Sequence, residues 1–244
     1  MYPVLFRWGS VSFYTYGLFT ALAVIAVFLT AAGRARRAGL PQGVVMDLVL
    51  LFFVSGVVGA RFFYILQHWP DYAGRPERML AIREGGLVWY GGFAAAVLSG
   101  VVTARLKRWP VLALADFFAP LLPLGHAIGR IGCFLNGCCY GRVTKSFDGM
   151  VFPGDSFRRL PVQLYEAAAL LILSFFLFFL FRRKRQPGEI FLSYLLFYGA
   201  MRFGAEFLRG DQVPVFYLTL PQWMSGALFL GAAVLLWVVR SRRA

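Results

Sequence analysis

Five charged residues stand inside long apolar stretches of this sequence: Arg61, Arg130, Glu166, Arg202 and Glu206. A charged side chain is costly to bury in such a stretch, so it marks a functional site by default. The alternatives are a structural ion pair or snorkelling to the surface, and snorkelling fits Arg61 best and Arg202 least. Guanidinium groups bind phosphate through two parallel hydrogen bonds. Paired arginines here therefore predict a phosphate site.

Helical spacing would bring several of these charges onto common faces. Tyr198, Arg202, Glu206 and Arg209 recur at i, i+4, i+8 and i+11, and His126, Arg130 and Cys133 recur at i, i+4 and i+7. Two arginine-bearing faces turned inward predict a cationic pocket, and a phospholipid headgroup is its natural ligand. A purely structural charge network is the competing interpretation.

The densest polar stretch runs from residue 126 to residue 141 and holds three cysteines, Cys133, Cys138 and Cys139. With His126 they would make four metal ligands, but C-x4-C-C is not a usual zinc spacing. A disulfide from Cys133 to Cys138 or Cys139 suits an oxidising compartment. Packing of small residues is the interpretation we favour, so we expect no metal ion.

Four glycines of the same stretch are spaced for close packing or for turns. Gly129, Gly132, Gly137 and Gly141 recur at intervals of three to five residues. Small residues let helices approach closely. Gly137 and Gly141 are equally suited to end a helix and to bring backbone N–H groups near an anion.

Seven apolar segments must position these residues. They span about 13–33, 44–67, 87–105, 111–135, 163–181, 189–208 and 222–239. We expect these segments to be helices, because a backbone in lipid must satisfy its hydrogen bonds internally. The predicted fold is therefore all-α, a single transmembrane domain over residues 1–244 with about seven spans of roughly 20 residues each.

Composition supports a membrane protein. Of 244 residues, 59% are hydrophobic and 15% charged, with a mean hydropathy of +0.67, whereas a soluble domain is about 45–50% apolar and about 25% charged. An ordinary soluble globule and a disordered chain are both excluded. The net charge of +14 comes with no nucleic-acid readout motif, so we expect no nucleic-acid partner. No cleaved signal peptide is expected either, since the first apolar run ends in a basic stop-transfer pattern.

The basic residues also predict an orientation. Loops near 34–37, 105–108, 182–185 and 240–243 hold thirteen Lys and Arg and no acid, whereas the opposite loops hold nine together with six acids. Short basic loops stay in the cytoplasm. We therefore expect the N-terminus outside, the C-terminus inside, and outward-facing loops near 68–86 and 136–162. The five charges then lie in the outer half of the bilayer. Asp47 and Asp116 lie at inner helix starts, where a carboxylate suits the helix dipole and is structural.

Six motifs, in order, resemble the prolipoprotein diacylglyceryl transferase family over most of the chain. They are YGL at 16–18, GAR at 59–61, GGLVWYGG at 85–92, GRIG at 129–132 with NG at 136–137 and Gly141, PVQLYE at 161–166, and YGAMRFGAEFLR at 198–209. The resemblance implies a multi-pass transferase of lipoprotein biosynthesis at the outer face of the bacterial inner (plasma) membrane. Such an enzyme moves diacylglyceryl from phosphatidylglycerol, a membrane lipid, to the lipobox cysteine thiol of a preprolipoprotein, and releases glycerol phosphate. The reaction needs no cofactor.

The resemblance also implies roles for individual residues. Arg130 and Arg202 match the family's essential arginines. Tyr16, Asn136, Gly141, Glu166 and Glu206 match its other functional positions, and Gln163 belongs to the matched PVQLYE motif. We expect the catalytic residues to be Arg130, Arg202 and Glu206, together with Tyr90 and His126, which the resemblance itself does not supply. We expect the substrate-binding residues to be Tyr16, Arg61, Asn136, Gly141, Gln163, Glu166 and Arg209.

Two departures from the family pattern fall at the expected chemistry. Tyr90 stands where the family usually has a histidine that is a candidate base, and Cys133 and Cys138 replace an Asn and a Glu. Our hypothesis is that Tyr90 orients the donor while His126, or the acceptor thiol's own ionisation, handles the proton. The alternatives are a paralogue that binds or moves phospholipid without catalysis, a transferase with another acceptor, and a cysteine-based redox or metal protein.

Overall fold

The structure is a computed structural model that describes residues 1–9, 11–81, 85–183, 186–210 and 214–241. It divides into two compact units, the first formed by Met1–Val27 with Ala115–Ala244 and the second by Phe28–Leu114. The predicted single domain over residues 1–244 stays a prediction. Residues 82–84 of the predicted outer loop, and the basic residues Lys184, Arg185, Arg242 and Arg243, lie outside the described residues.

Each of the seven predicted apolar segments is helical over most of its length. The long helices are α1 (Thr15–Ala35), α2 (Gln42–Gln67), α4 (Trp89–Leu106), α5 (Val111–Phe118), α6 (Leu121–Asn136), α7 (Val162–Phe181), α8 (Glu189–Glu206) and α9 (Leu220–Ser241). Within the described residues, five helices are long and apolar enough to cross a membrane: α1, α2, the stretch of α5 with α6, α7 and α9. The chain is therefore a multi-pass helical membrane protein.

Short elements occupy the connections. They are η1 (Arg36–Ala38), α3 (Trp69–Tyr72), η2 (Pro76–Leu80) and three antiparallel strand pairs: β1 (Val4–Trp8) with β2 (Val11–Tyr14), β3 (Met150–Val151) with β4 (Arg158–Arg159), and β5 (Pro214–Val215) with β6 (Leu218–Thr219). The first predicted apolar segment therefore begins as a strand, since Phe13 and Tyr14 belong to β2. The alternating apolar and polar residues from Val11 to Tyr14 carried that signal.

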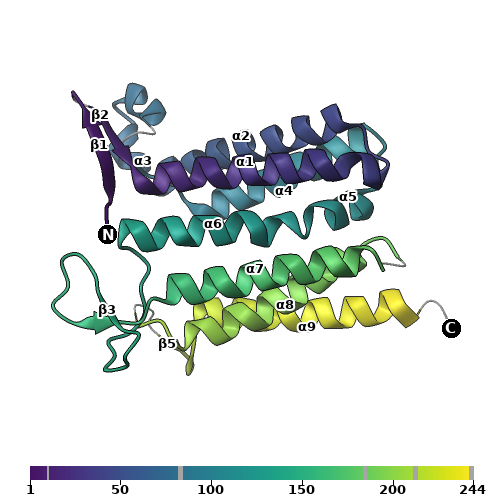
Figure 1. Cartoon of the computed structure of the whole chain (residues 1–244). Helices are drawn as coiled ribbons and strands as arrows, with labels where there is room; N and C mark the ends of the chain where they lie inside the picture. The colour runs from purple at the N-terminus through teal and green to yellow at the C-terminus, as the bar shows by residue number, and fades with distance from the viewer. Residues whose placement is uncertain (10, 82–84, 184–185, 211–213, 242–244) are drawn as a thin grey trace. The chain divides into compact units, whose positions relative to one another are not determined.

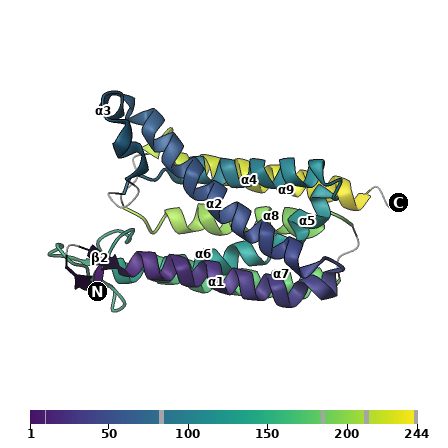
Figure 2. The ribbon, with the colours of Figure 1, turned by 90° about the horizontal axis from the view of Figure 1, so that it is seen from above.

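In the second unit, α2 packs against α4 (Figure 2), and glycines of both helices lie at the contact. A Cβ placed on Gly59 would lie 2.3 Å from Ala95 Cβ and 2.6 Å from the Gly91 carbonyl oxygen. A Cβ on Gly91 would lie 2.5 Å from Phe63 Cβ. The two backbones approach this closely only because neither glycine has a side chain.

In the first unit, α7 packs on α6 and on α8, and α8 packs on α9 (Figure 1). Leu173 and Leu177 of α7 and Ile190 of α8 are buried together with Ala119. The long apolar runs of α7 and α8 thus make the core, and they hold the polar residues of these helices in fixed positions.

The segment predicted as one helix over 111–135 is broken into α5 and α6 at Ala119 and Pro120. Proline has no N–H to continue the helical ladder. The Pro120 carbonyl oxygen accepts a hydrogen bond from Ser174 Oγ at 2.8 Å. This contact joins the break to α7.

Asp116 is a structural residue, as predicted, but it acts on a different helix. Its carboxylate accepts hydrogen bonds from the backbone N–H groups of Gly188, Ile190 and Phe191 at 2.8–3.0 Å. These donors begin α8, and a carboxylate suits the positive end of that helix. Asp47 is exposed and lies beyond the first turn of α2.

The glycine contact in the second unit gives the first prediction. Gly59→Ala should lower the free energy of unfolding by about 1–3 kcal/mol, because the new methyl group overlaps α4. Gly56→Ala is the matched control on the same helix, since its Cβ would lie 3.8 Å from the nearest atom, the Gly92 carbonyl oxygen. Thermal unfolding of both variants in detergent provides the comparison. Equal stability of the two would contradict the proposed contact.

Candidate functional site

Four of the five predicted charges meet in one ion-pair network within the first unit. Glu166 of α7 bridges two arginines: its Oε2 lies 2.8 Å from Arg130 Nε on α6, and its Oε1 accepts a hydrogen bond of 3.1 Å from Arg202 Nη1 on α8. Arg202 Nη2 lies 2.7 Å from Glu206 Oε2, one turn further along α8. The predicted common face of Arg202 and Glu206 is confirmed. Three helices are thus joined through Glu166.

The network is neutral rather than cationic. Two guanidinium groups and two carboxylates carry no net charge, so the predicted excess of positive charge is wrong for these four residues. The carboxylates of Glu166 and Glu206 are 3% and 0% exposed, and the two arginine side chains are 14% and 15% exposed. Burying one of these charges without a partner would cost roughly several kcal/mol of folding free energy, and the ion pairs offset this cost.

Arg130 uses only part of its guanidinium group in this network. Its ion pair with Glu166 is made by Nε. Its two Nη groups have no protein partner among the described residues. The two Nη groups of an arginine are donors that can bind an oxyanion bidentately. The geometry therefore leaves Arg130 able to take an anionic ligand while it stays bound to Glu166.

Thr219 and Gln222 complete the network, and the sequence analysis missed both. Thr219 Oγ1 donates a hydrogen bond of 3.2 Å to Glu206 Oε1. The Thr219 backbone N–H donates to Gln222 Oε1 at 2.9 Å, and the Gln222 N–H returns a bond to Thr219 Oγ1 at 3.4 Å. The T-x-x-Q spacing at the start of α9 is a capping box, and this signal was available in the sequence.

His126 lies one turn before Arg130 on α6 and faces Tyr198 of α8, with ring centroids 5.9 Å apart. Tyr198 in turn stacks on Tyr194 at 5.5 Å. His126 is also within electrostatic range of the Arg130 and Arg202 charges. The predicted grouping of His126 with Arg130 is consistent with this arrangement. Its role at the chemistry stays a prediction.

Gly137 and Gly141 shape the chain after α6. Gly137 adopts a left-handed conformation (φ 75°) and ends the helix directly after Asn136, so its predicted capping role is confirmed. The Gly141 N–H donates to the Leu160 carbonyl oxygen at 2.8 Å. A Cβ on Gly141 would lie 2.5 Å from the Leu208 carbonyl oxygen. Gly141 is therefore needed for packing, and substrate binding by Asn136 and Gly141 stays a prediction.

The remaining predicted residues of the first unit lie around these helix ends. Gln163 is buried, and its Nε2 donates to the Cys138 carbonyl oxygen at 2.6 Å. Tyr16 is 48% exposed in the first turn of α1 and lies beside Gly132, whose Cβ would be 3.7 Å from the tyrosine ring. Arg209 follows α8, and its N–H donates to the Glu206 carbonyl oxygen at 3.1 Å. Substrate binding by Gln163, Tyr16 and Arg209 stays a prediction.

Arg61 belongs to the second unit and makes a different kind of site. Its guanidinium group donates to four carbonyl oxygens, those of Arg78, Met79, Gly85 and Gly86, at 2.7–3.2 Å. It is 6% exposed, so the snorkelling interpretation is wrong. Among the described residues, its hydrogen-bond partners are carbonyl oxygens. Arg61 thereby joins α2 to the end of η2 and to the two glycines before α4, and its predicted substrate contact stays a prediction.

Tyr90 also belongs to the second unit. It lies in the first turn of α4, four residues after Gly86, and its side chain is 55% exposed. Arg61 fixes the two glycine carbonyls just before this turn. The predicted role of Tyr90 in orienting the donor stays a prediction.

The connection between α6 and α7 is tied to α7 by a side-chain hydrogen bond from Tyr165 to Asp148. Hydrogen bonds from Ser146 and then Tyr165 lower the pKa of Asp148. The Phe157 N–H, at 3.0 Å, and then Arg159 lower the pKa of Asp155 in the same way. A lowered carboxyl pKa adds stability above the unfolded pKa, and that stability is lost as the pH falls through the folded pKa.

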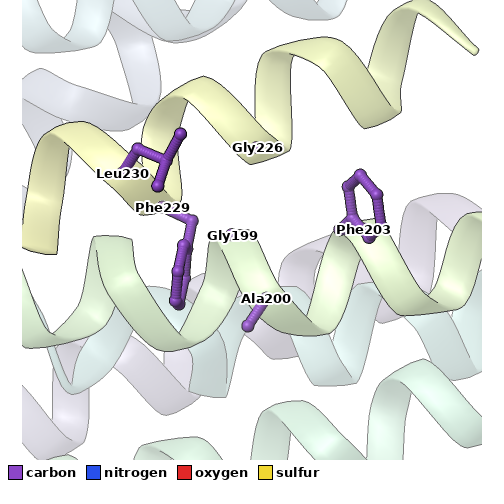
Figure 3. Close-up of a pocket in the computed structure, with 6 residues that line it drawn as sticks. All are labelled: Gly199, Ala200, Phe203, Gly226, Phe229 and Leu230. Carbon is purple, nitrogen blue, oxygen red and sulfur yellow. The ribbon is translucent and has the colours of Figure 1, made fainter. Parts of the chain in front are cut away.

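A separate groove of 360 Å³ opens between α8 and α9. Gly199, Ala200, Phe203, Gly226, Phe229 and Leu230 line it. Phe203 extends from α8 toward α9, and Phe229 extends from α9 toward α8 (Figure 3). No polar side chain belongs to this lining, so the groove cannot supply ligands to a charged headgroup. The polar chemistry of the first unit lies in the Glu166 network.

Comparison with known proteins decides the family. Residues 3–238 match the family described as prolipoprotein diacylglyceryl transferase. The chain belongs to this family. Similar proteins named phosphatidylglycerol–prolipoprotein diacylglyceryl transferase occur in Geobacter sulfurreducens (37% identical, covering 93% of this chain and 91% of the relative), Clostridium tetani (32%, 86% and 86%) and Cupriavidus necator (38%, 80% and 75%).

Family membership confirms the resemblance seen in the sequence. The prolipoprotein diacylglyceryl transferase family is a family of transferases of lipoprotein biosynthesis, and this chain is an enzyme of that kind. Three motifs that carried the resemblance supply Arg130, Glu166 and Arg202. The structure joins them in a single network.

The bridge by Glu166 gives the second prediction. Glu166→Gln should lower the free energy of unfolding by about 3 kcal/mol, because two partly buried guanidinium groups lose their shared counter-charge. Arg240→Gln is the control. Arg240 is 55% exposed and pairs at 2.8 Å with Glu189, whose side chain is 11% exposed, so breaking this half-exposed pair should cost less than breaking the buried bridge. Thermal unfolding in detergent measures both. A loss for Glu166→Gln no larger than the control's would show that the bridge does not hold the helices.

Proposed function

We propose that this protein transfers the diacylglyceryl group of phosphatidylglycerol to the lipobox cysteine thiol of preprolipoproteins. The convergence of Arg130, Glu166 and Arg202 from three matched motifs is the observation that carries the proposal. The relatives reported above are named for this substrate pair. Phosphatidylglycerol and a preprolipoprotein are thus the proposed partners of this chain.

Arg130 is the proposed ligand of the donor phosphate. Its two Nη groups are the pair of donors that its ion pair with Glu166 does not use. Glu166 fixes the plane of the guanidinium group, so little side-chain freedom is lost when phosphate binds. Arg202, held by Glu166 and Glu206, would add positive charge beside the leaving phosphate ester as it forms.

The proposed reaction is a nucleophilic substitution at the carbon of the diacylglyceryl group that is bonded to the phosphate oxygen. The acceptor thiolate forms the S–C bond, the C–O bond to phosphate breaks, and glycerol phosphate leaves with the bonding electrons. The thiol has a reference pKa of about 8.5, so its proton must be removed. His126 is the proposed acceptor of this proton, and Tyr90 the proposed residue that orients the donor. No electron is gained or lost overall.

We also propose that all seven helical segments cross the bacterial inner membrane, α4 and α8 included. The proposed N-terminus is outside and the C-terminus in the cytoplasm, because the short connections after α1, α4, α7 and α9 are purely basic. The ends of α6 and α8 that carry Arg130 and Arg202 would then lie in the outer leaflet, where the lipobox cysteine is presented.

Turnover in vesicles tests the function and gives the third prediction. The purified protein, in phosphatidylglycerol vesicles with a lipobox peptide, should form a thioether and release glycerol phosphate. Arg130→Lys and Arg202→Lys should each reduce the rate about 100-fold, because lysine cannot replace a bidentate donor. Arg240→Lys is the control and should keep the rate. Headgroup binding without turnover would instead support the phospholipid-binding paralogue.

Topology reporters give the fourth prediction. A reporter active only in the periplasm should be silent when fused after Ala244 and active when inserted near Asp148, which lies in the connection between α6 and α7. The basic connections hold the C-terminus in the cytoplasm. The reverse pattern would overturn the proposed orientation of the network.

A further inference from the structure

The three cysteines form one compact cluster at the end of α6. The sulfur atoms of Cys133, Cys138 and Cys139 all lie within 4.8 Å of one another, and those of Cys138 and Cys139 are 3.6 Å apart. All three are free thiols of intermediate burial. His126, the fourth ligand considered from the sequence, is not part of the cluster.

The backbone explains how an unusual spacing closes into a cluster. The left-handed conformation of Gly137 ends α6, and the Cys138 N–H then bonds back to the Cys133 carbonyl oxygen at 3.1 Å. This reversal returns Cys138 to the last turn of the helix. Cys139 has a φ of 63°, which is uncommon for a residue other than glycine. Strain of this kind persists only where the surroundings enforce it.

A buried side chain supports the same turn from α7. Gln163 is fully buried and donates to the Cys138 carbonyl oxygen at 2.6 Å. Its Oε1 is buried without a hydrogen-bond partner among the described residues. Gln163 thus fixes the main chain that carries two of the three thiols, which is the kind of support that metal ligands receive from outer-shell residues.

We propose that Cys133, Cys138 and Cys139 bind one zinc ion through their three thiolates and leave its fourth coordination position open to an external ligand. Zinc–sulfur bonds of about 2.3 Å place the sulfurs of a tetrahedral site about 3.8 Å apart. The sulfur–sulfur separations in the cluster, at most 4.8 Å and 3.6 Å for one pair, differ from this spacing by about 1 Å or less. Sulfur ligands select zinc over harder cations such as magnesium.

Charge also fits a zinc ion. Three thiolates and Zn²⁺ carry one net negative charge, and Arg130 lies three residues before Cys133 on the same helix, where side chains are neighbours. A disulfide would use only two of the three sulfurs and would leave the third without a function. The assignment does not depend on the proposed transferase activity.

Metal binding by the full chain tests the proposal and gives the fifth prediction. The protein in detergent, reduced and stripped with a chelator, is titrated anaerobically with Co²⁺ alone. It should develop thiolate-to-cobalt charge-transfer absorption that saturates at one ion per chain and disappears when Zn²⁺ is added. Zinc should also protect all three thiols from alkylation and raise the unfolding temperature.

Single substitutions identify the ligands. Cys133→Ser, Cys138→Ser and Cys139→Ser should each weaken Co²⁺ binding by more than about 100-fold, since even outer-shell partners contribute about 10–100-fold. Gln163→Ala should weaken binding less than these do. His68→Gln is the control for adventitious binding and should change nothing. The unfolding temperature of each metal-free variant shows whether it folds.

Three results would overturn the assignment. One is the absence of charge-transfer absorption in the reduced wild-type protein. Another is full affinity in a cysteine variant. The third is a thiol count showing that two cysteines are oxidised as isolated and that none is protected by zinc after reduction, which would establish a disulfide pair instead.

Discussion

A buried carboxylate shared by two guanidinium groups is the interaction on which the site of the first unit depends. Glu166 on α7 holds Arg130 on α6 and Arg202 on α8, and Glu206 supplies the second negative charge. In a medium of low dielectric constant, no member can be withdrawn without leaving an uncompensated charge. The three helices are therefore constrained to one register, and this register keeps the Nη groups of Arg130 available.

The rest of the first unit keeps these helices in place by hydrogen bonds to backbone groups at helix ends. Asp116 binds the first N–H groups of α8, and Ser174 binds the carbonyl oxygen at the break before α6. The capping box of Thr219 and Gln222 begins α9 and extends to Glu206. Structural hydrogen bonds and the charge network thus share residues, so stability and site geometry are coupled.

Arginines in apolar helices serve two different purposes in this protein. Arg130 and Arg202 pair with carboxylates. Arg61 also lies inside an apolar segment, but its hydrogen-bond partners among the described residues are carbonyl oxygens at the end of η2 and just before α4. Glycine residues are divided in the same way: Gly59 permits helix contact, whereas Gly137 permits a turn. In each case the surroundings of the residue, and not its type, decide its role.

The sequence by itself determined the helical membrane fold, the seven apolar segments, the family, and the pairing of Arg202 with Glu206, because period and hydropathy are local properties. It also singled out Glu166 and the cysteine-rich stretch. Only the tertiary structure decided that Glu166 neutralises both arginines, that Asp116 caps α8 rather than its own helix, and that Cys133, Cys138 and Cys139 close into one cluster. These outcomes depend on distances between residues far apart in the chain or on backbone angles such as the φ of Cys139, and neither is encoded in spacing along one helix.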